Sequence, residues 1–232
     1  MHFAPLGDRA ITISLGESID YTTHRLVRAV SALLDARPAQ GLVDQVPAFV
    51  SVTVYYDPAL VPGEPSAPPY HRMVSLLEQT LSGVRPDKLE PARLVDIPVC
   101  YGGAFGPDLD DVARQHDLRA EQVIEIHSGG EYLVYMVGFM PGFAYLGGLS
   151  DRIATPRRSS PRTLVPAGTV GIGGQQTGVY PLESPGGWNL IGRTPLRIFD
   201  ISREEAALLG TGDRVRFRPI TPAEFESHPA RS

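Results

Sequence analysis

The sequence predicts an α+β protein with a small α/β domain at residues 1–90 and a β-barrel domain at residues 91–232. In the first domain, segments with a two-residue apolar period alternate with segments whose apolar residues lie three and four positions apart, as in strands and helices respectively. In the second domain, short apolar segments recur between Gly- and Pro-rich turns, which is typical of a closed or nearly closed barrel. A chain of 232 residues is long enough to form two cores.

Six elements are expected in the first part of the chain. In order, they are a strand at 9–15, a helix that begins at Thr22 or Thr23, strands at 42–46 and 49–55 joined as a hairpin through Pro47, a helix at 70–81 and a strand at 93–99. The helices carry apolar stripes, and prolines and glycines separate the elements. The order β-α-β-β-α-β matches a ferredoxin-like sandwich.

The second domain is expected to open with two short helices and a strand. The helices lie at 108–116 and 120–127, where Asp108 and Glu121 stand in the first turns and favour the helix dipoles. The strand at 132–137 has no polar alternation, so we expect burial on both of its faces. Five further strands are expected at 169–172, 177–180, 188–191, 196–199 and 214–219.

Two more helix starts are expected towards the end of the second domain. Ser202 and Glu205 have the spacing of a capping box, which predicts a helix that begins there. Thr221, Pro222 and Glu224 combine a capping residue, a proline at the first helical position and an acidic first turn, so they predict the start of a last helix.

The composition is that of a soluble globular protein, with 42% hydrophobic and 20% charged residues. A formal net charge of −5 gives no electrostatic support to a role on nucleic acid or on an anionic membrane. No apolar run approaches the ~20 residues that span a bilayer, and the first residues lack the pattern of a secretory signal. The single cysteine, Cys100, fits a buried and inert thiol in a reducing compartment. The expected location is therefore cytoplasmic.

Arginine is the cation available for chemistry, because Lys88 is the one lysine among 21 basic residues. Arg157, Arg158 and Arg162 occupy a Pro-bounded loop. A guanidinium group binds carboxylate or phosphate through two hydrogen bonds, and a stiff loop lowers the entropy lost in holding that group in place. The spacing alone is equally compatible with a binding loop and with a solvated surface loop.

His127 lies at the end of an expected helix and is a candidate acid–base group, since the carboxyl end of a helix favours the charged form of histidine. The alternative is a histidine that caps the last carbonyl groups of the helix. No second histidine and no cysteine pair stands at a metal-binding spacing, so no metal site is expected.

The turns between residues 136 and 200 are rich in Gly and Pro and carry amide and aromatic side chains, a combination that suits a rigid binding surface. Gln175 and Gln176 follow the glycine-rich run 171–174 and can donate and accept hydrogen bonds to a ligand. The glycines are also compatible with a barrel strand that another backbone crosses closely. Core packing is the alternative role for Trp188. The candidates for a pocket wall are Phe139, Pro141, Phe143, Tyr145, Tyr180 and Trp188.

The chain resembles the family that contains the B subunit of 5-oxoprolinase, the sporulation-kinase inhibitor KipI and allophanate hydrolase subunit 1. Four segments carry the resemblance, in this order: VCYGG with GPDLDDVA, HSGGEYLVYMVGFMPGFAYL, PRRSSPRTLVPAGTVGIGGQQTGVYPLESPGGWNLIGRTP, and TGDRVRFRPI. The resemblance covers essentially the whole chain and is strongest over 101–220. The GFxPGF, PRxxxPRxxVPAG and GGW motifs of the family are all present. The family is related to the first half of the urea carboxylase carboxyltransferase domain.

The resemblance implies a small α/β domain followed by a cyclophilin-like β-barrel. It also implies one component of an enzyme complex that opens 5-oxo-L-proline to L-glutamate, with ATP as co-substrate and with the homologous C subunit and the A subunit of 5-oxoprolinase as partners. Two other functions stay open. One is a KipI-like protein that binds a histidine kinase and inhibits it, and the other is a carboxyltransferase subunit of the allophanate hydrolase or urea carboxylase type.

The candidate residues and the implied reaction together give a hypothesis for the site. Arg157 and Arg162 hold the substrate carboxylate or a phosphate group, because they are the stiffly held cations of the chain. Gln175 and Gln176 orient the bound group, and His127 handles a proton. The aromatic side chains and Pro141 wall the pocket for substrate and ATP.

Overall fold

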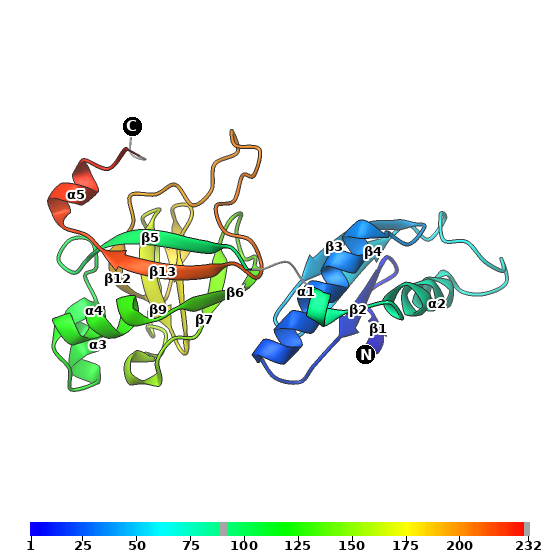
Figure 1. Ribbon diagram of the computed structural model, residues 1–232, viewed down its shortest axis with the longest axis horizontal. Coiled ribbons are helices and arrows are strands. Elements are labelled where there is room, and N and C mark those ends of the chain that lie inside the picture. Colours follow the sequence, from blue (N-terminus) through cyan, green and yellow to red (C-terminus); the bar gives the residue numbers. More distant parts are fainter. Residues whose placement is uncertain (89–91, 230–232) are drawn as a thin grey trace. The chain divides into compact units, whose positions relative to one another are not determined.

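The computed structural model describes residues 1–88 and 92–229, and the chain divides into two compact units, Met1–Pro91 and Ala92–Ser232 (Figure 1). Each unit buries a hydrophobic cluster of its own. The domain boundary predicted at residues 90 and 91 lies outside the described residues. The first unit combines a small sheet with helices, and the second is dominated by strands.

Over residues 1–88, the first unit forms a four-stranded antiparallel sheet with two helices packed against one face. Its elements are β1 (His2–Pro5), β2 (Ala10–Ser14), α1 (Tyr21–Ala36), β3 (Leu42–Pro47), β4 (Ser51–Tyr56), α2 (Pro69–Leu81) and the 3-10 turn η1 (Pro86–Lys88). The sheet order is β1-β2-β4-β3, so β4 lies between the two strands that α1 connects. Alternate strand residues such as Ile11, Ile13 and Val52 share one buried cluster with Val30 of α1 and Leu77 of α2.

The predicted ferredoxin-like arrangement of this region is not confirmed. Strand β2, helix α1 and the β3–β4 hairpin do form the predicted split βαβ unit. The strand predicted at 93–99, however, is β5 (Leu94–Tyr101), and it belongs to the barrel of the second unit. The edge position next to β2 is occupied by β1 instead. This strand is four residues long and contains a proline, so it gives no clear strand signal.

Helix α1 begins at Tyr21, one residue before the predicted caps. Its N-cap is Asp20, whose carboxylate accepts hydrogen bonds from the Thr23 backbone N–H at 2.9 Å and from the Thr23 hydroxyl at 3.0 Å. An ionised carboxylate at this position also favours the positive end of the helix dipole. Asp20, rather than Thr22 or Thr23, therefore sets the start of the helix.

Over residues 92–229, the second unit is built around a closed seven-stranded barrel with the order β10-β7-β6-β13-β5-β12-β9, and β9 pairs with β10 to close it. The barrel strands are β5, β6 (Tyr132–Val137), β7 (Ala144–Gly147), β9 (Thr169–Gly173), β10 (Gln176–Val179), β12 (Asn189–Arg193) and β13 (Arg214–Pro219). Strands β5 and β13 pair in parallel, with Leu94 opposite Arg214, whereas the other neighbours are antiparallel.

Smaller elements surround the barrel. They are α3 (Leu109–Gln115), α4 (Ala120–Gly129), the 3-10 turn η2 (Asp151–Ile153), β8 (Arg162–Val165), β11 (Ser184–Gly186) and α5 (Pro222–Glu226). Strands β8 and β11 pair with each other in a separate two-stranded sheet. Helix α5 begins at the predicted position, and Thr221 and Glu224 form a capping box in which they satisfy each other's backbone N–H groups.

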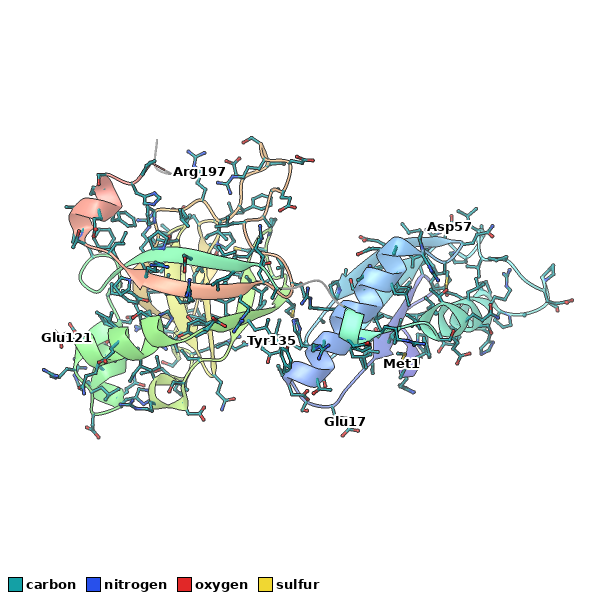
Figure 2. All side chains as sticks on the ribbon, in the orientation of Figure 1. Met1, Glu17, Asp57, Glu121, Tyr135 and Arg197 are labelled. Carbon is teal, nitrogen blue, oxygen red and sulfur yellow. The ribbon has the colours of Figure 1, made fainter. Side chains whose placement is uncertain are left out.

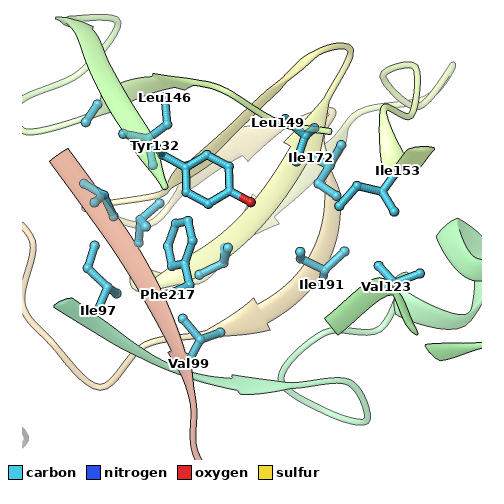
Figure 3. Close-up of a cluster of buried hydrophobic side chains, with 14 of the residues drawn as sticks. Ile97, Val99, Val123, Tyr132, Leu146, Leu149, Ile153, Ile172, Ile191 and Phe217 are labelled. Atoms are coloured by element: carbon cyan, nitrogen blue, oxygen red, sulfur yellow. The ribbon is translucent and has the colours of Figure 1, made fainter. Parts of the chain in front are cut away.

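Side chains from alternate strand positions fill the barrel interior, and Figure 3 shows the centre of this cluster. The rings of Tyr132 and Phe217 lie with their centroids 5.2 Å apart. Aliphatic residues such as Ile97, Ile172 and Ile191 surround them (Figure 3). Because these side chains fill the interior, we expect a ligand to bind on the outside of the barrel.

Two elements predicted for the second unit are wrong. Residues 196–199 are an irregular segment with one bridge, from Phe199 to Ala207, and not a strand. The helix predicted at Ser202 is a series of turns, because the Asp200 carboxylate accepts hydrogen bonds from both the backbone N–H and the hydroxyl of Ser202. The Ser202 hydroxyl therefore does not cap a helix.

Burial on both faces, predicted for residues 132–137, is found only in part. In β6, Tyr132 and Val134 are fully buried, and the residues that alternate with them are half-buried. Strands β7, β8 and β11, which have three or four residues each, are too short to give a periodic signal and are absent from the prediction.

Candidate functional site

The aromatic residues predicted to wall a pocket gather in one cluster outside the barrel core. Its centre is Phe143, and the rings of Phe139, Tyr145, Tyr180 and Trp188 lie 4.9–5.6 Å from the Phe143 ring, between centroids. All four contacts are edge-to-face, the geometry that the charge distribution of aromatic rings favours. Phe143, Tyr180 and Trp188 are buried in a hydrophobic cluster separate from that of the barrel interior. We refer to these five residues as the aromatic cluster.

The indole ring of Trp188 lies against strands β9 and β10 where these strands carry glycine. Val170 and Ile172 of β9 point into the barrel core, so the glycines that alternate with them face outward. A Cβ atom at Gly173 would lie 2.5 Å from the indole Nε1, and one at Gly178 would lie 3.2 Å from the indole ring. The glycine-rich run therefore makes room for this side chain, and a Cβ at Gly171 would also lie 3.3 Å from the Asn189 backbone oxygen, so a neighbouring backbone passes close by as well.

A buried carboxylate anchors the arginine loop beside the aromatic cluster. Asp108 is 2% exposed, and its Oδ1 accepts hydrogen bonds from Arg158 Nη1 at 3.0 Å and from Arg162 Nη2 at 2.6 Å. Its Oδ2 accepts from the Leu190 backbone N–H at 2.7 Å, and the Asp108 N–H donates to the Leu190 carbonyl at 2.9 Å. Because hydrogen bonds between charged groups are among the stronger ones, Asp108 holds both guanidinium groups against the barrel wall.

The third arginine of the loop contacts the aromatic cluster directly. The guanidinium carbon of Arg157 lies 5.9 Å from the centroid of the Trp188 ring, within cation–π range. Burial raises the pKa of the Tyr180 hydroxyl, while the Trp188 backbone N–H and the positive charges of Arg157 and Arg162 act in the opposite direction. Arginine charge and tyrosine hydroxyl are therefore neighbours in this site.

One guanidinium nitrogen of the site lacks a partner. Within residues 1–88 and 92–229, Arg162 Nη1 is buried and makes no hydrogen bond. Its other terminal nitrogen, Nη2, is held by Asp108. A buried donor without an acceptor is destabilising, and it becomes favourable when an acceptor binds. The Nη1 atom of Arg162 therefore has an unused hydrogen-bond donor.

The loop between β6 and β7 forms an exposed rim of the aromatic cluster. Phe139 is 68% exposed, and Pro141 is exposed as well. The φ angle of Phe139 is 71°, a backbone conformation that is strained for a bulky side chain. Gly142, with φ 78°, approaches Phe199 so closely that a Cβ would lie 2.9 Å from the Phe199 Cβ. Such strain is concentrated at functional loops.

His127 lies in the barrel interior and not in the site. It is fully buried, and its ring stacks near Phe217 with centroids 4.5 Å apart. The Thr177 hydroxyl donates to the Gly171 carbonyl, so it accepts from His127 Nε2 at 2.9 Å, and Nδ1 accepts from the Tyr101 hydroxyl at 2.8 Å. Burial lowers the pKa of His127 to about 3. The placement fits a neutral structural histidine, and it does not fit the predicted proton carrier or a carbonyl cap.

The two glutamines stand apart from the arginines. Gln175 is exposed in the turn between β9 and β10, and its Nε2 lies 3.5 Å from the Asp151 carboxylate. The side chain of Gln176 is half-buried and makes no hydrogen bond within the described part of the chain. Neither amide is hydrogen-bonded to an arginine of the loop in the residues that the structure describes. The structure therefore does not bring them together with Arg157 and Arg162.

Sequence reasoning missed Asp108 as a residue of the site. Its partners Arg158, Arg162 and Leu190 lie 50, 54 and 82 positions further along the chain, so no local pattern reveals the contact. The available signal is Gly106, two residues before Asp108. A Cβ at Gly106 would lie 2.0 Å from the Ile191 carbonyl oxygen, so a glycine at this position is consistent with a second backbone passing close by. The close approach of these backbones places Asp108 beside Leu190.

Neither a metal-binding cluster nor a membrane-spanning helix is found among the described residues. Within 1–88 and 92–229, no group of three or more His, Cys, Asp or Glu side chains is placed to hold a metal ion. In the same residues, every helix is too short or too polar to cross a membrane. Cys100 is buried on β5, where burial raises the pKa of its thiol, so the predicted buried cysteine is confirmed.

Residues 1–209 match the family described as carboxyltransferase domain, subdomain C and D. The chain is 46% identical to the B subunit of 5-oxoprolinase from Bacillus subtilis (strain 168) over 231 residues, which cover 98% of this chain and 96% of that one. It is 42% identical to the B subunit of 5-oxoprolinase from Escherichia coli O157:H7 over 215 residues, covering 92% and 94% of the two chains.

Solved structures show the same fold. The crystal structure of TTHA0988 has a TM-score of 0.79 and 38% identity, and the match covers 91% of this chain but 40% of that chain. The present chain thus spans less than half the length of TTHA0988. The Kluyveromyces lactis urea amidolyase has a TM-score of 0.75 at 22% identity, over 97% of this chain and 15% of that one.

Proposed function

Because the chain belongs to the family of carboxyltransferase subdomains C and D, we propose that it is the B subunit of an ATP-dependent 5-oxoprolinase. The observation that carries this proposal is the 46% identity to the B subunit of a known 5-oxoprolinase over 98% of the chain. The proposal is also supported by the arginine loop and the aromatic cluster, which bring cationic and apolar side chains together on the barrel wall.

The reaction requires activation of the substrate, because a lactam carbonyl is a poor electrophile. In the proposed sequence, the lactam oxygen of 5-oxo-L-proline accepts the γ-phosphoryl group of ATP, and ADP leaves. Water adds to the activated carbon, the ring C–N bond breaks, and the nitrogen takes up a proton. A second water molecule then releases phosphate and leaves L-glutamate. Negative charge on the carbonyl and phosphoryl oxygens is stabilised best by cationic donors that are already fixed in place.

The residues of the site divide this work. Arg162, through its buried and unpartnered Nη1, and Arg157, over Trp188, bind the substrate carboxylate or a phosphoryl group. Asp108 holds Arg162 in position. The aromatic cluster packs against the apolar atoms of the bound ring, and the activated carbon stays open to the attacking water. We assign no proton transfer to His127, because it is enclosed in the barrel.

The proposal includes partners and a compartment. The relatives are each named as one of several subunits of an enzyme, and we propose that the homologous C subunit and the A subunit of 5-oxoprolinase are the partners, with ATP as the co-substrate of the complex. The exposed rim residues Phe139 and Pro141 leave one side of the site open to a neighbouring protein. A single, buried cysteine supports assembly in the cytoplasm.

The test is turnover by the assembled complex. The chain is co-expressed with the candidate C and A subunits, and ATP-dependent release of L-glutamate from 5-oxo-L-proline is measured. Arg162→Lys is expected to lower turnover about 100-fold, because the single ammonium group of lysine cannot place one nitrogen on Asp108 and another on the bound anion. Arg152→Lys, at an exposed position of η2, is the matched control and should leave turnover unchanged. Turnover by Arg162→Lys at the level of the control would remove Arg162 from the site.

Failure of the complex to release glutamate would overturn the function itself. Two further assays then decide between the other functions that the family resemblance allows. Inhibition of autophosphorylation of a histidine kinase would identify a kinase inhibitor. Carboxyl transfer from a biotinylated carrier would identify a carboxyltransferase subunit.

A further inference from the structure

A cavity whose lining contains no residue of the arginine loop opens on the outside of the barrel unit. Its volume is about 230 Å³. We propose that this cavity binds a small oxyanion with an apolar body, that is, a carboxylate or phosphate compound of about the size of an amino acid. The residues that form it are Ala167, Gly168, Pro181, Arg193, Thr194, Pro195, Leu196, Arg197, Phe199 and Phe225.

The floor of the cavity is rigid. The Gly168 N–H donates to the Tyr180 carbonyl at 2.7 Å, and the Thr194 N–H donates to the Gly168 carbonyl at 2.9 Å. Gly168 has a φ of 81°, and a Cβ there would lie 2.5 Å from the Thr194 carbonyl oxygen, so a larger residue would not fit. A floor that is already ordered lowers the entropy cost of binding a small ligand.

Two guanidinium groups give the cavity its charge. Arg193 Nε donates to the Ala167 carbonyl at 2.9 Å, which orients the side chain. In the described part of the chain, its two terminal nitrogens make no hydrogen bond, and no carboxylate pairs with it. Arg197, labelled in Figure 2, lies in the segment between β12 and β13. Positive charge on Arg193 is thus free to bind an anion.

The one carboxylate near Arg197 in the described residues does not neutralise the cavity. Asp200 Oδ2 lies 3.8 Å from Arg197 Nη1 and 3.8 Å from Arg203 Nε, so two arginines share it. Asp200 itself is not part of the cavity wall, and the wall contains no Asp or Glu side chain. An uncompensated positive charge beside a cavity favours anionic ligands over neutral or cationic ones.

The remaining wall is apolar. Pro181, Phe199 and Phe225 face the cavity together with Pro195 and Leu196. Phe225, from helix α5, is held by the ring of Phe105, 4.6 Å away between centroids. The cavity is smaller than the pockets of about 300–1,000 Å³ that hold drug-sized ligands, so a ligand of few atoms is expected. The guanidinium groups would bind its oxyanion, and the rings would pack on its apolar atoms.

Direct binding to the full chain tests this site, and it does not depend on turnover by the complex. Inorganic phosphate, L-glutamate and 5-oxo-L-proline are each titrated into the chain by calorimetry, and NMR follows the Arg193 Nε–H and the Gly168 and Thr194 amides. We expect at least one probe to bind and to shift these three signals. The phosphate arm and the two carboxylate arms distinguish the possible ligands.

The variants Arg193→Gln and Arg197→Gln are each expected to weaken that binding about tenfold. Arg197 is 62% exposed, so its replacement leaves the fold intact even if Arg193→Gln does not fold. Arg152→Gln, at an exposed position outside the cavity, should bind like the unmodified chain. The proposal would be overturned if none of the three probes binds at concentrations up to about 10 mM. It would also be overturned if a probe binds and neither arginine variant weakens that binding.

Discussion

Arg162 Nη2 donates a hydrogen bond to Asp108 Oδ1 over 2.6 Å, and this ion pair joins two segments that are 54 residues apart. Asp108 lies directly before α3, and Arg162 opens β8. The same carboxylate is bound to the Leu190 backbone of the barrel. The position of the arginine loop therefore depends on one acidic side chain that is itself fixed to the barrel wall.

Replacing Asp108 should affect both stability and the site. Asp108→Ala leaves two arginines without their carboxylate and the Leu190 N–H without its side-chain acceptor, so we expect a loss of about 3 kcal/mol in the free energy of unfolding. Urea unfolding followed by the fluorescence of Trp188 measures this loss. Asp111→Ala, which removes an exposed partner of Arg114, should cost less than about 0.5 kcal/mol. Equal effects of the two substitutions would contradict the anchoring role.

The contact between Trp188 and the glycines of the barrel wall can be tested by adding one methyl group. Gly173→Ala places a Cβ 2.5 Å from the indole, so the ring must move, and we expect a loss of about 1–3 kcal/mol and a shifted fluorescence maximum. Gly129→Ala is the control, because nothing lies within 4 Å of its added Cβ. An unchanged Trp188 emission in Gly173→Ala would show that the indole is not packed there.

The buried His127 predicts a pH dependence of stability. Burial lowers its pKa from 6.5 to about 3, so the unfolded chain binds a proton below pH 6.5 that the folded chain does not. The contribution of His127 to stability is therefore fully present above pH 6.5, and it falls by up to about 1.4 kcal/mol per pH unit as the pH decreases towards 3. His127→Gln should lose this component when the two unfolding curves are compared by Trp188 fluorescence.

The same variant separates a structural role from a catalytic one. Because His127 does not reach the arginine loop, the pH profile of turnover by the assembled complex should be the same for His127→Gln and for the unmodified chain, provided that the variant is folded. A profile that loses one ionisation in the variant would return His127 to the reaction.

Replacing the strained Phe139 should lower function while leaving stability nearly unchanged. Phe139→Gly relieves the positive φ and removes an exposed ring, so the free energy of unfolding should change by less than about 1 kcal/mol. Turnover of the complex should fall, because the edge-to-face contact with Phe143 is lost at the rim of the site. Ile201→Gly, at another exposed apolar position, serves as the control and should leave turnover unchanged.

Local signals predicted much of the fold. The apolar stripes of α1 and α2, the β3–β4 hairpin and the Thr221 capping box all rest on residues within a few positions of each other. Ser202 and Glu205 have the same spacing as Thr221 and Glu224. The Ser202 hydroxyl, however, is hydrogen-bonded to Asp200 and so does not cap a helix. The position of β5 could not be predicted from periodicity, because its pairing with β13 spans about 120 residues.

The sequence predicted which types of residue gather at the site. It predicted the roles of the individual residues less well. Aromatic residues concentrated among glycines and prolines do form one cluster, and the arginines lie beside it. The structure places His127 away from the arginine loop, because a side chain at a helix end can also turn into the barrel, towards Thr177 and Tyr101. The partners of Asp108 depend on contacts across the whole unit, which no local pattern encodes.

The parallel pairing of β5 with β13 has a consequence for synthesis of the chain. Until β13 has left the ribosome, β5 and β6 each lack one neighbour, and their exposed backbone edges can pair with other nascent chains. Barrel closure is thus a late event that waits for nearly complete translation of the unit. Messenger RNAs truncated between the codons for β12 and β13 should therefore yield aggregated protein rather than a smaller folded protein.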